Sequence, residues 1–136
     1  MLEHIRDDRT VVKIMHQKLR EGGKVFIYVP ALPFLYSAMD KKVGHYRRYT
    51  KAALAELFDG EWQIKYLRYA DILGAAASVG LKWFGAKDGN LNGTAVKIFD
   101  RIIYPFSLAL DKISAGRIIG KNLILCAVKK SFPAER

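Results

Sequence analysis

The glycine pair Gly22–Gly23 constrains the fold most, because a helical pattern meets a strand pattern there. Before the pair, Asp7 or Asp8 can cap a helix, and four apolar residues then recur on one helix face: Val11, Val12, Met15 and Leu19. After it, residues 24–29 form a β-branched and aromatic run closed by Pro30, which is typical of a buried strand. Glycine accepts the left-handed conformation that ends helices. The pair therefore predicts an α/β connection.

The pattern after this strand predicts a loop, a helix and two more strands. Pro30 and Pro33 block longer regular structure at the start of residues 31–49, which predict a loop with a short helix near 35–41. Thr50 is a candidate helix cap. The expected buried face of that helix contains Ala53, Leu54, Leu57 and Phe58. The alternation over 62–69 predicts a half-buried strand, and the run 122–129 predicts the third.

Residues 70–120 predict an apolar helical insertion before the last strand, with a Gly/Asn-rich break at 85–93. Thr94 is expected to cap a long amphipathic helix that Pro105 kinks. Five residues of this helix are predicted to point inward: Val96, Phe99, Ile102, Ile103 and Phe106. The longest apolar stretch, 72–81, is too short to cross a bilayer.

Length and composition limit the class of protein. The 136 residues suit one domain, and 51% hydrophobic with 26% charged residues is typical of a folded chain. Cys126 lies in the apolar run 122–128 and is interpreted as a small core residue, which favours a reducing environment. Because no secretory leader opens the sequence, we expect a cytoplasmic protein.

The net charge of +10 favours an anionic partner such as nucleic acid, lipid or a phosphorylated substrate. The basic residues are scattered, and no P-loop, Cys/His cluster or RNA-binding aromatic signature accompanies them, so nucleic acid is disfavoured and no metal site is predicted. Two alternatives to an enzyme stay open. One is a basic module that binds lipid or nucleic acid, and the other is a regulatory or pseudoenzyme partner subunit.

Several short motifs follow one another at a characteristic spacing: Leu2-Glu3-His4-Ile5 with Asp7-Asp8, Arg20-Glu21-Gly22-Gly23, Val29-Pro30-Ala31 and Gly44-His45-Tyr46-Arg47-Arg48-Tyr49-Thr50. In this order the chain resembles class I S-adenosylmethionine-dependent methyltransferases of the methyltransferase-11-like branch, most strongly over residues 2–69. The resemblance implies the C-terminal half of a Rossmann-like seven-stranded sheet. The three strands here would be the fifth, the sixth and an antiparallel seventh.

The resemblance also implies a methyl donor, S-adenosylmethionine, held in such enzymes on a Gly-x-Gly-x-Gly turn between a strand and a helix. This sequence has no such turn, because Gly22–Gly23 follows a helix and precedes a strand. We therefore expect residues 1–136 to form a single partial methyltransferase domain from a truncated frame or a fragment, which is inactive alone.

By family position, three residues would line the rim of the cofactor site: Leu2, Glu3 and His4. His4 would face the donor methyl group or act as an acid or base, which makes it the expected catalytic residue. The alternative is a histidine at a helix start that hydrogen-bonds the backbone.

The 44–49 loop is the densest polar cluster and is expected to bind substrate through His45, Arg47, Arg48 and Tyr49. Arginine pairs bidentately with carboxylate or phosphate, so an anionic or hydroxyl-rich acceptor fits. The alternative is a structural knot in which an arginine pairs with Asp40.

The expected acceptor is a small molecule or a lipid-linked compound. The aromatic residues among basic ones in 70–120 also suggest peripheral membrane contact, although aromatic stripes at helical spacing are commonly core. An unpartnered edge of the first strand predicts self-association.

Overall fold

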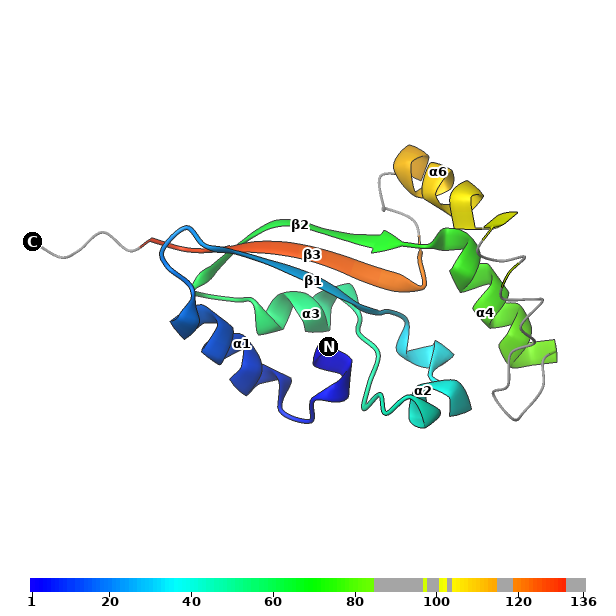
Figure 1. The fold of residues 1–136 in the computed structure, drawn as a ribbon, viewed down its shortest axis with the longest axis horizontal. Coiled ribbons are helices and arrows are strands. Elements are labelled where there is room, and N and C mark those ends of the chain that lie inside the picture. The colour runs from blue at the N-terminus through cyan, green and yellow to red at the C-terminus, as the bar shows by residue number, and fades with distance from the viewer. Residues whose placement is uncertain (85–96, 98–100, 103, 115–118, 132–136) are drawn as a thin grey trace, which may run out of the picture.

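The computed structural model of the chain describes residues 1–84, 97, 101–102, 104–114 and 119–131. Helices and strands alternate along most of this chain, and the described helices pack on the face and at one end of an open sheet (Figure 1). This is an α/β architecture, as predicted.

The sheet contains three strands, β1 (Lys24–Pro30), β2 (Trp62–Ala70) and β3 (Asn122–Lys129), in the spatial order β1-β3-β2. The central strand β3 is antiparallel to both neighbours, so β1 and β2 run parallel to each other. Two parallel strands need a crossover connection, and helices supply it here. The prediction of three strands with an antiparallel last strand is confirmed.

One face of the sheet is covered by α1 (Asp8–Lys18) and α3 (Lys51–Leu57), which lie side by side beneath it in Figure 1. Alternate residues of the strands point into this layer, and the ones most deeply buried are Val29, Leu123, Leu125 and Ala127. The hydrophobic core lies between these residues and the two helices.

The opposite face of the sheet is open in its middle. Phe26 exposes 62% of its surface there and Tyr28 exposes 47%. Cys126 lies on the same face, paired in register with Phe26, and is only partly buried. Its interpretation as a core residue is therefore wrong. In a run that is apolar on both faces, alternation gives no sign of which residues point inward.

Helix α1 begins after Asp7, whose carboxylate accepts a hydrogen bond from a backbone N–H of the first turn. The helix ends at Lys18, before the glycine pair. Gly22 has a φ of +69°, and a Cβ on Gly23 would lie 2.7 Å from the carbonyl oxygen of Arg20. The pair therefore forms the tight turn between α1 and β1, as the α/β connection requires, rather than the end of the helix itself.

Helix α3 is capped by Thr50, as predicted. The Thr50 hydroxyl accepts a hydrogen bond from the backbone N–H of Ala53. Leu54 and Phe58, one turn apart, are buried against the sheet. Ala53 is exposed, so its prediction as a core residue is wrong. Ala53 lies at the edge of the apolar face of α3, where a methyl group is too short to reach the sheet.

The segment between β1 and α3 contains a 3-10 turn, η2 (Pro33–Leu35), and the short helix α2 (Ala38–Lys42). A second 3-10 turn, η1 (Leu2–His4), precedes α1. The predicted short helix near 35–41 is thus close to the observed one. A parallel bridge joins Ala31, just after β1, to Tyr49. The loop that precedes α3 is therefore fastened at the carboxyl end of β1.

After β2 come α4 (Ile72–Phe84) and α6 (Tyr104–Ser114), which pack against each other at the end of the sheet (Figure 1). The predicted cap Thr94, together with Val96, Phe99 and Ile103, lies outside the described residues. Within the described part of the chain, no helix is long and apolar enough to span a membrane.

Two predictions for the insertion are wrong. Ile102 and Phe106 are exposed, not inward. Pro105 lies in the first turn of α6, and the kink predicted there stays untested because most of the preceding segment lies outside the described residues. The inward side of α6 carries Ser107, which hydrophobic periodicity cannot reveal.

Candidate functional site

The turn η1 and the 44–49 loop lie against each other although they are far apart in the sequence. The backbone N–H of Tyr46 donates to the carbonyl oxygen of Glu3 at 2.7 Å. The rings of His4 and His45 meet edge to face with centroids 4.7 Å apart. Gly44, with a φ of +78°, makes the turn after α2 that brings His45 back to η1. Sequence analysis selected both segments, and the fold places them together.

Asp40 organises one side of this site. Its buried carboxylate accepts two hydrogen bonds from Arg48, from Nε and Nη2, each at 3.0 Å. Ser37 donates its N–H and its hydroxyl to the same carboxylate, and His45 Nδ1 lies 3.0 Å from Oδ1. Burial acts to raise the pKa of Asp40, but the hydrogen bonds from Arg48 and His45 outweigh it and lower the pKa. We call Ser37, Asp40, His45 and Arg48 the Asp40 cluster.

Asp8 organises the other side. Its Oδ2 accepts a hydrogen bond from Arg47 Nη1 at 2.7 Å and one from the Tyr49 hydroxyl at 2.8 Å. Arg47 also donates Nη2 to the carbonyl oxygen of Arg6 at 2.6 Å. Burial, and then the hydrogen bond to Asp8, raise the pKa of the Tyr49 hydroxyl. These contacts join the start of α1 to the loop before α3.

The residues expected to bind substrate therefore have different surroundings. Arg48 exposes 8% of its side chain and is held by Asp40, whereas Arg47 exposes 35% and can meet a further anion while it stays bound to Asp8. Tyr49 is buried. His45 keeps part of its ring accessible beside His4. For Arg48 the alternative prediction, an arginine paired with Asp40, is the contact that the structure has.

The residues expected at the cofactor rim also differ in exposure. Leu2 is buried in the core, and His4 exposes 46% of its side chain. Glu3 is mostly buried, with Oε1 3.7 Å from His4 Nε2 and Oε2 accepting a hydrogen bond from the Met1 amine. Burial acts to raise the pKa of Glu3, but the hydrogen bonds from the amine and the backbone outweigh it and lower the pKa. The site thus places a carboxylate beside two histidine rings.

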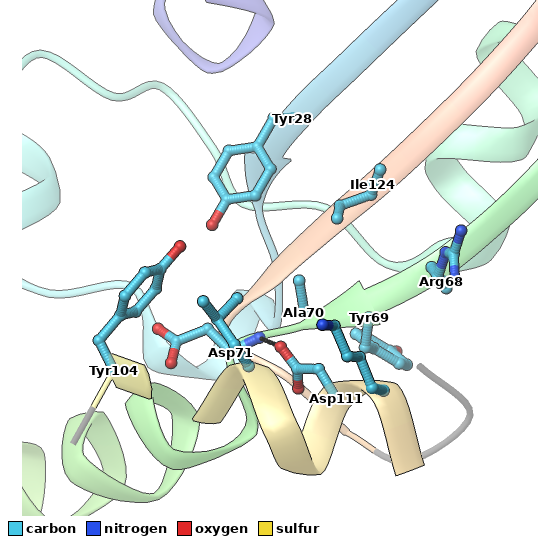
Figure 2. A pocket seen from close by; sticks show the side chains of 10 residues that line it. Tyr28, Arg68, Tyr69, Ala70, Asp71, Tyr104, Asp111 and Ile124 are labelled. Carbon is cyan, nitrogen blue, oxygen red and sulfur yellow. Dashed lines mark hydrogen bonds between the residues drawn. The ribbon is translucent and has the colours of Figure 1, made fainter. Parts of the chain in front are cut away.

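A cavity of about 200 Å³ lies on the open face of the sheet, near the carboxyl ends of β1 and β2. Figure 2 shows Tyr28 from β1 and Tyr104 from α6 with their hydroxyl groups pointing toward each other across it. Burial raises the pKa of Tyr28 to about 12, and the nearby Tyr104, Asp71 and Asp111 act in the same direction.

The two carboxylates that line this cavity also hold α4 in place. Asp111 accepts the backbone N–H groups of Asp71 and Ile72, at 2.5 and 3.2 Å. Asp71 accepts the N–H of Gly74 and the hydroxyl of Ser107, each at 2.9 Å. We interpret them as structural caps of α4.

Sequence analysis missed this cavity. Two signals could have indicated it. Asp71 directly follows a strand, and Asp111 interrupts an apolar helix. Asp71 also accepts the nearby Gly74 N–H, but Ser107 is 36 residues from Asp71 and Asp111 is 40 residues from it, so no local spacing relates the parts of the cavity.

No protein-family model matches the chain, and no curated protein matches it.

Proposed function

We propose that this chain forms the acceptor side of a class I S-adenosylmethionine-dependent methyltransferase. The observation that carries the proposal is the contact between η1 and the 44–49 loop. The resemblance assigns the first segment to the cofactor rim and the second to the acceptor side, and a methyl transfer requires these two sides to face each other. The proposed roles therefore need the adjacency that the fold provides.

The position of the site in the sheet also supports the proposal. In open α/β sheets, ligands bind outside the carboxyl ends of the strands. The bridge from Ala31 to Tyr49 fastens the 44–49 loop at the carboxyl end of β1, and the cavity lies by Asp71 at the carboxyl end of β2. In this proposal the sheet is the C-terminal half of the seven-stranded methyltransferase sheet.

The residues present do not fit the methyl donor on their own. Leu2 is buried in the core and Glu3 is mostly buried, so His4 is the one residue of the three expected at the rim whose side chain is well exposed. One imidazole does not hold a nucleoside, and the glycine turn is absent from the sequence. In this proposal the donor is held by residues outside the 136, and we assign no step to it here.

In this proposal, the chain's own residues orient the acceptor. His4 and His45 present partly exposed rings that can contact an acceptor hydroxyl or amine. Arg47 can attract an anionic acceptor with the exposed part of its guanidinium. Arg48 and Tyr49 act indirectly, because they hold the loop through Asp40 and Asp8.

The free edge of β1 is the basis of the proposed self-association. Over residues 24–29, β1 pairs only with β3 among the described strands. Its other edge offers backbone donors and acceptors to a further strand, from additional methyltransferase residues or from a second copy. Light scattering on the chain should detect self-association. A monodisperse monomer would contradict this part of the proposal.

A second function, contact with a lipid surface, is favoured by one observation on α6. One side of this helix exposes Phe106, Leu110 and Ile113, whereas Tyr104 and Leu108 lie on the other side and line the cavity. With a net charge of +10, such a face suits an anionic membrane or a lipid-linked acceptor. Cosedimentation with vesicles that contain phosphatidylserine should capture the chain, and Phe106→Ser should release it. Equal capture of both proteins would exclude this face.

The methyltransferase proposal is tested in two steps. The chain alone should not bind S-adenosylmethionine in calorimetry at millimolar or tighter affinity, since the glycine turn is absent. The coding sequence that precedes codon 1 should encode a strand followed by Gly-x-Gly-x-Gly, and an acidic residue about twenty positions later. The polypeptide that includes those residues should then transfer a radiolabelled methyl group.

In that polypeptide, His45→Ala should lower methyl transfer without lowering donor affinity, whereas His16→Ala, at a histidine beside Trp62 and outside the site, should change neither. Micromolar donor binding by the chain alone would show that the cofactor site is misplaced. A stop codon directly upstream with no glycine motif would overturn the proposal.

A further inference from the structure

We propose that Glu3, His4 and His45 form a binding site for a divalent transition-metal ion. Each residue offers one ligand atom, and these atoms all lie within 4.8 Å of one another. They belong to two segments, η1 and the 44–49 loop, that the fold brings into contact. The inference goes beyond the proposed methyltransferase function and does not depend on it.

The donor set defines the class of ion. Two imidazoles and one carboxylate are ligands that zinc prefers, and a three-ligand set leaves a fourth position for water or an acceptor oxygen. With bonds of about 2.0 to 2.1 Å, tetrahedral ligand atoms lie about 3.3 Å apart. Glu3 Oε1 and His4 Nε2 are 3.7 Å apart, and no two ligand atoms of the group are more than 4.8 Å apart, so side-chain rotation must bring the atoms closer by up to about 1.5 Å to close the site. A single carboxylate suits calcium and magnesium poorly, since they require several oxygen ligands.

The residue behind His45 supports a metal role. His45 Nδ1 lies 3.0 Å from Asp40 Oδ1, which leaves Nε2 as the ring nitrogen available to an ion. Metal-bound histidines usually donate their other ring nitrogen to a carboxylate, which fixes the ring and raises its basicity. Asp40 is itself held by Arg48 and Ser37, so the orientation of the His45 ring is set before any ion binds.

The backbone also holds the two segments in place. The Tyr46 N–H bonds to the Glu3 carbonyl oxygen, and the His45 N–H bonds to the Asp40 carbonyl oxygen at 2.8 Å. Bringing the three ligands together therefore needs no new ordering of the loop, which favours binding. The sequence predicted no metal site because His4 and His45 do not share a short ligand spacing.

Equilibrium dialysis of the full chain against zinc sulfate tests the proposal, since it measures stoichiometry whatever the association state. We expect one zinc per chain. Cobalt should replace zinc and give the visible absorption of a tetrahedral or five-coordinate ion, and millimolar magnesium or calcium should not compete. His4→Gln and His45→Gln should each weaken zinc binding by about 100-fold or more, because even loss of a residue behind a ligand costs about 10- to 100-fold.

His16→Gln is the matched control, since His16 lies against Trp62 and outside the three-residue group. It should leave zinc affinity unchanged. Asp40→Asn should weaken binding by about 10- to 100-fold, with circular dichroism showing that each variant is folded.

No stoichiometric zinc bound to the folded chain, or equal zinc affinity in wild type, His4→Gln and His45→Gln, would overturn the proposal. Loss of binding in His16→Gln as well would also overturn it, because the site would then lie elsewhere. Since the measurement uses metal alone and no methyl donor, its failure would leave the methyltransferase proposal untouched.

Discussion

Asp40 and Asp71 are both buried aspartates next to a candidate site, yet their partners differ in kind. Asp40 exposes 2% of its surface and is bound by the guanidinium of Arg48, with His45 and Ser37 beside it. Asp71 exposes 6% and accepts hydrogen bonds from neutral donors, the Ser107 hydroxyl and the Gly74 N–H. One is a compensated charge, and the other caps a helix.

The difference shows what each region depends on. A buried carboxylate with an arginine is stable as a pair and costly when one partner is removed. Asp71 has a φ of +62° and lies where a Cβ on Gly74 would clash with it, so its region depends on close packing and on several modest hydrogen bonds. The 44–49 loop should therefore respond to charge, and the start of α4 should respond to volume.

The largest expected effect is that of Arg48→Ala. This change leaves the Asp40 carboxylate buried without its guanidinium, and it should lower the free energy of unfolding by about 3 to 5 kcal/mol. Urea denaturation measures the loss.

The double variant Arg48→Met/Asp40→Leu removes both charges and should recover most of that loss, since an apolar pair of similar size often replaces a buried ion pair without net cost. If Arg48→Ala lost less than 1 kcal/mol, which is the range of an exposed pair, the pair would not be buried and the contrast with Asp71 would fail.

Gly74→Ala should have the next largest effect. An added Cβ would lie 1.8 Å from Asp71 Oδ2, so the cap must move, at a cost of about 1 to 3 kcal/mol. Helix propensity alone would make the same change stabilising by about 1 kcal/mol. The sign of the change in thermal denaturation is therefore decisive.

Ala76→Gly, at an exposed position of α4, is the matched control. It should lower stability by about 1 kcal/mol through propensity alone. A Gly74→Ala variant more stable than wild type would show that Asp71 does not lie over Gly74.

The sequence was sufficient to predict the three strands, which are apolar, β-branched or alternating runs, and also α1 and α3, which have helical periodicity and a polar cap, Asp7 or Thr50. It was insufficient to predict which face of the sheet each residue of β3 points to, because both faces of this strand are apolar. Cys126 was therefore assigned wrongly to the core. It was also wrong on α6, where Phe106 is exposed and the polar Ser107 is buried. Burial of a serine depends on its distant partner Asp71, which local spacing does not show.

The candidate site was predictable in composition but not in geometry. The motif singled out His45, Arg47 and Arg48 as one polar group. Their distribution between Asp40 and Asp8 depends on chain segments that come together only in the fold. Adjacent arginines point to different partners, so neighbouring residues in one motif need not share one function.

Ser107→Ala should have a smaller effect at the second aspartate. Its hydroxyl donates to Asp71 Oδ1 at 2.9 Å and accepts the N–H of Leu73 at 3.1 Å. Because Asp71 keeps the Gly74 N–H, the loss in unfolding free energy should be about 1 kcal/mol. Ser107→Cys keeps the volume and restores a weak donor, and it should lie between Ala and wild type. A loss as large as that of Arg48→Ala would mean that Asp71 also depends on a single partner.

The smallest expected effect is the acid dependence of stability that comes from Asp40. Its pKa is lowered in the folded chain from an ordinary value of 3.8, so the unfolded chain binds its proton first as the pH falls. The contribution of Asp40 is therefore fully present above about pH 4, and it is lost as the pH falls through the folded pKa.

Glu3 and Asp7 also have lowered pKa values and act in the same direction, so a reference without Asp40 is needed. The double variant Arg48→Met/Asp40→Leu supplies it. Urea denaturation between pH 6 and pH 3 should show a shallower loss of stability in this variant than in wild type. Parallel curves for the two proteins would mean that the Asp40 carboxyl titrates alike in the folded and unfolded chain, and the charge-compensated half of the comparison would then be wrong.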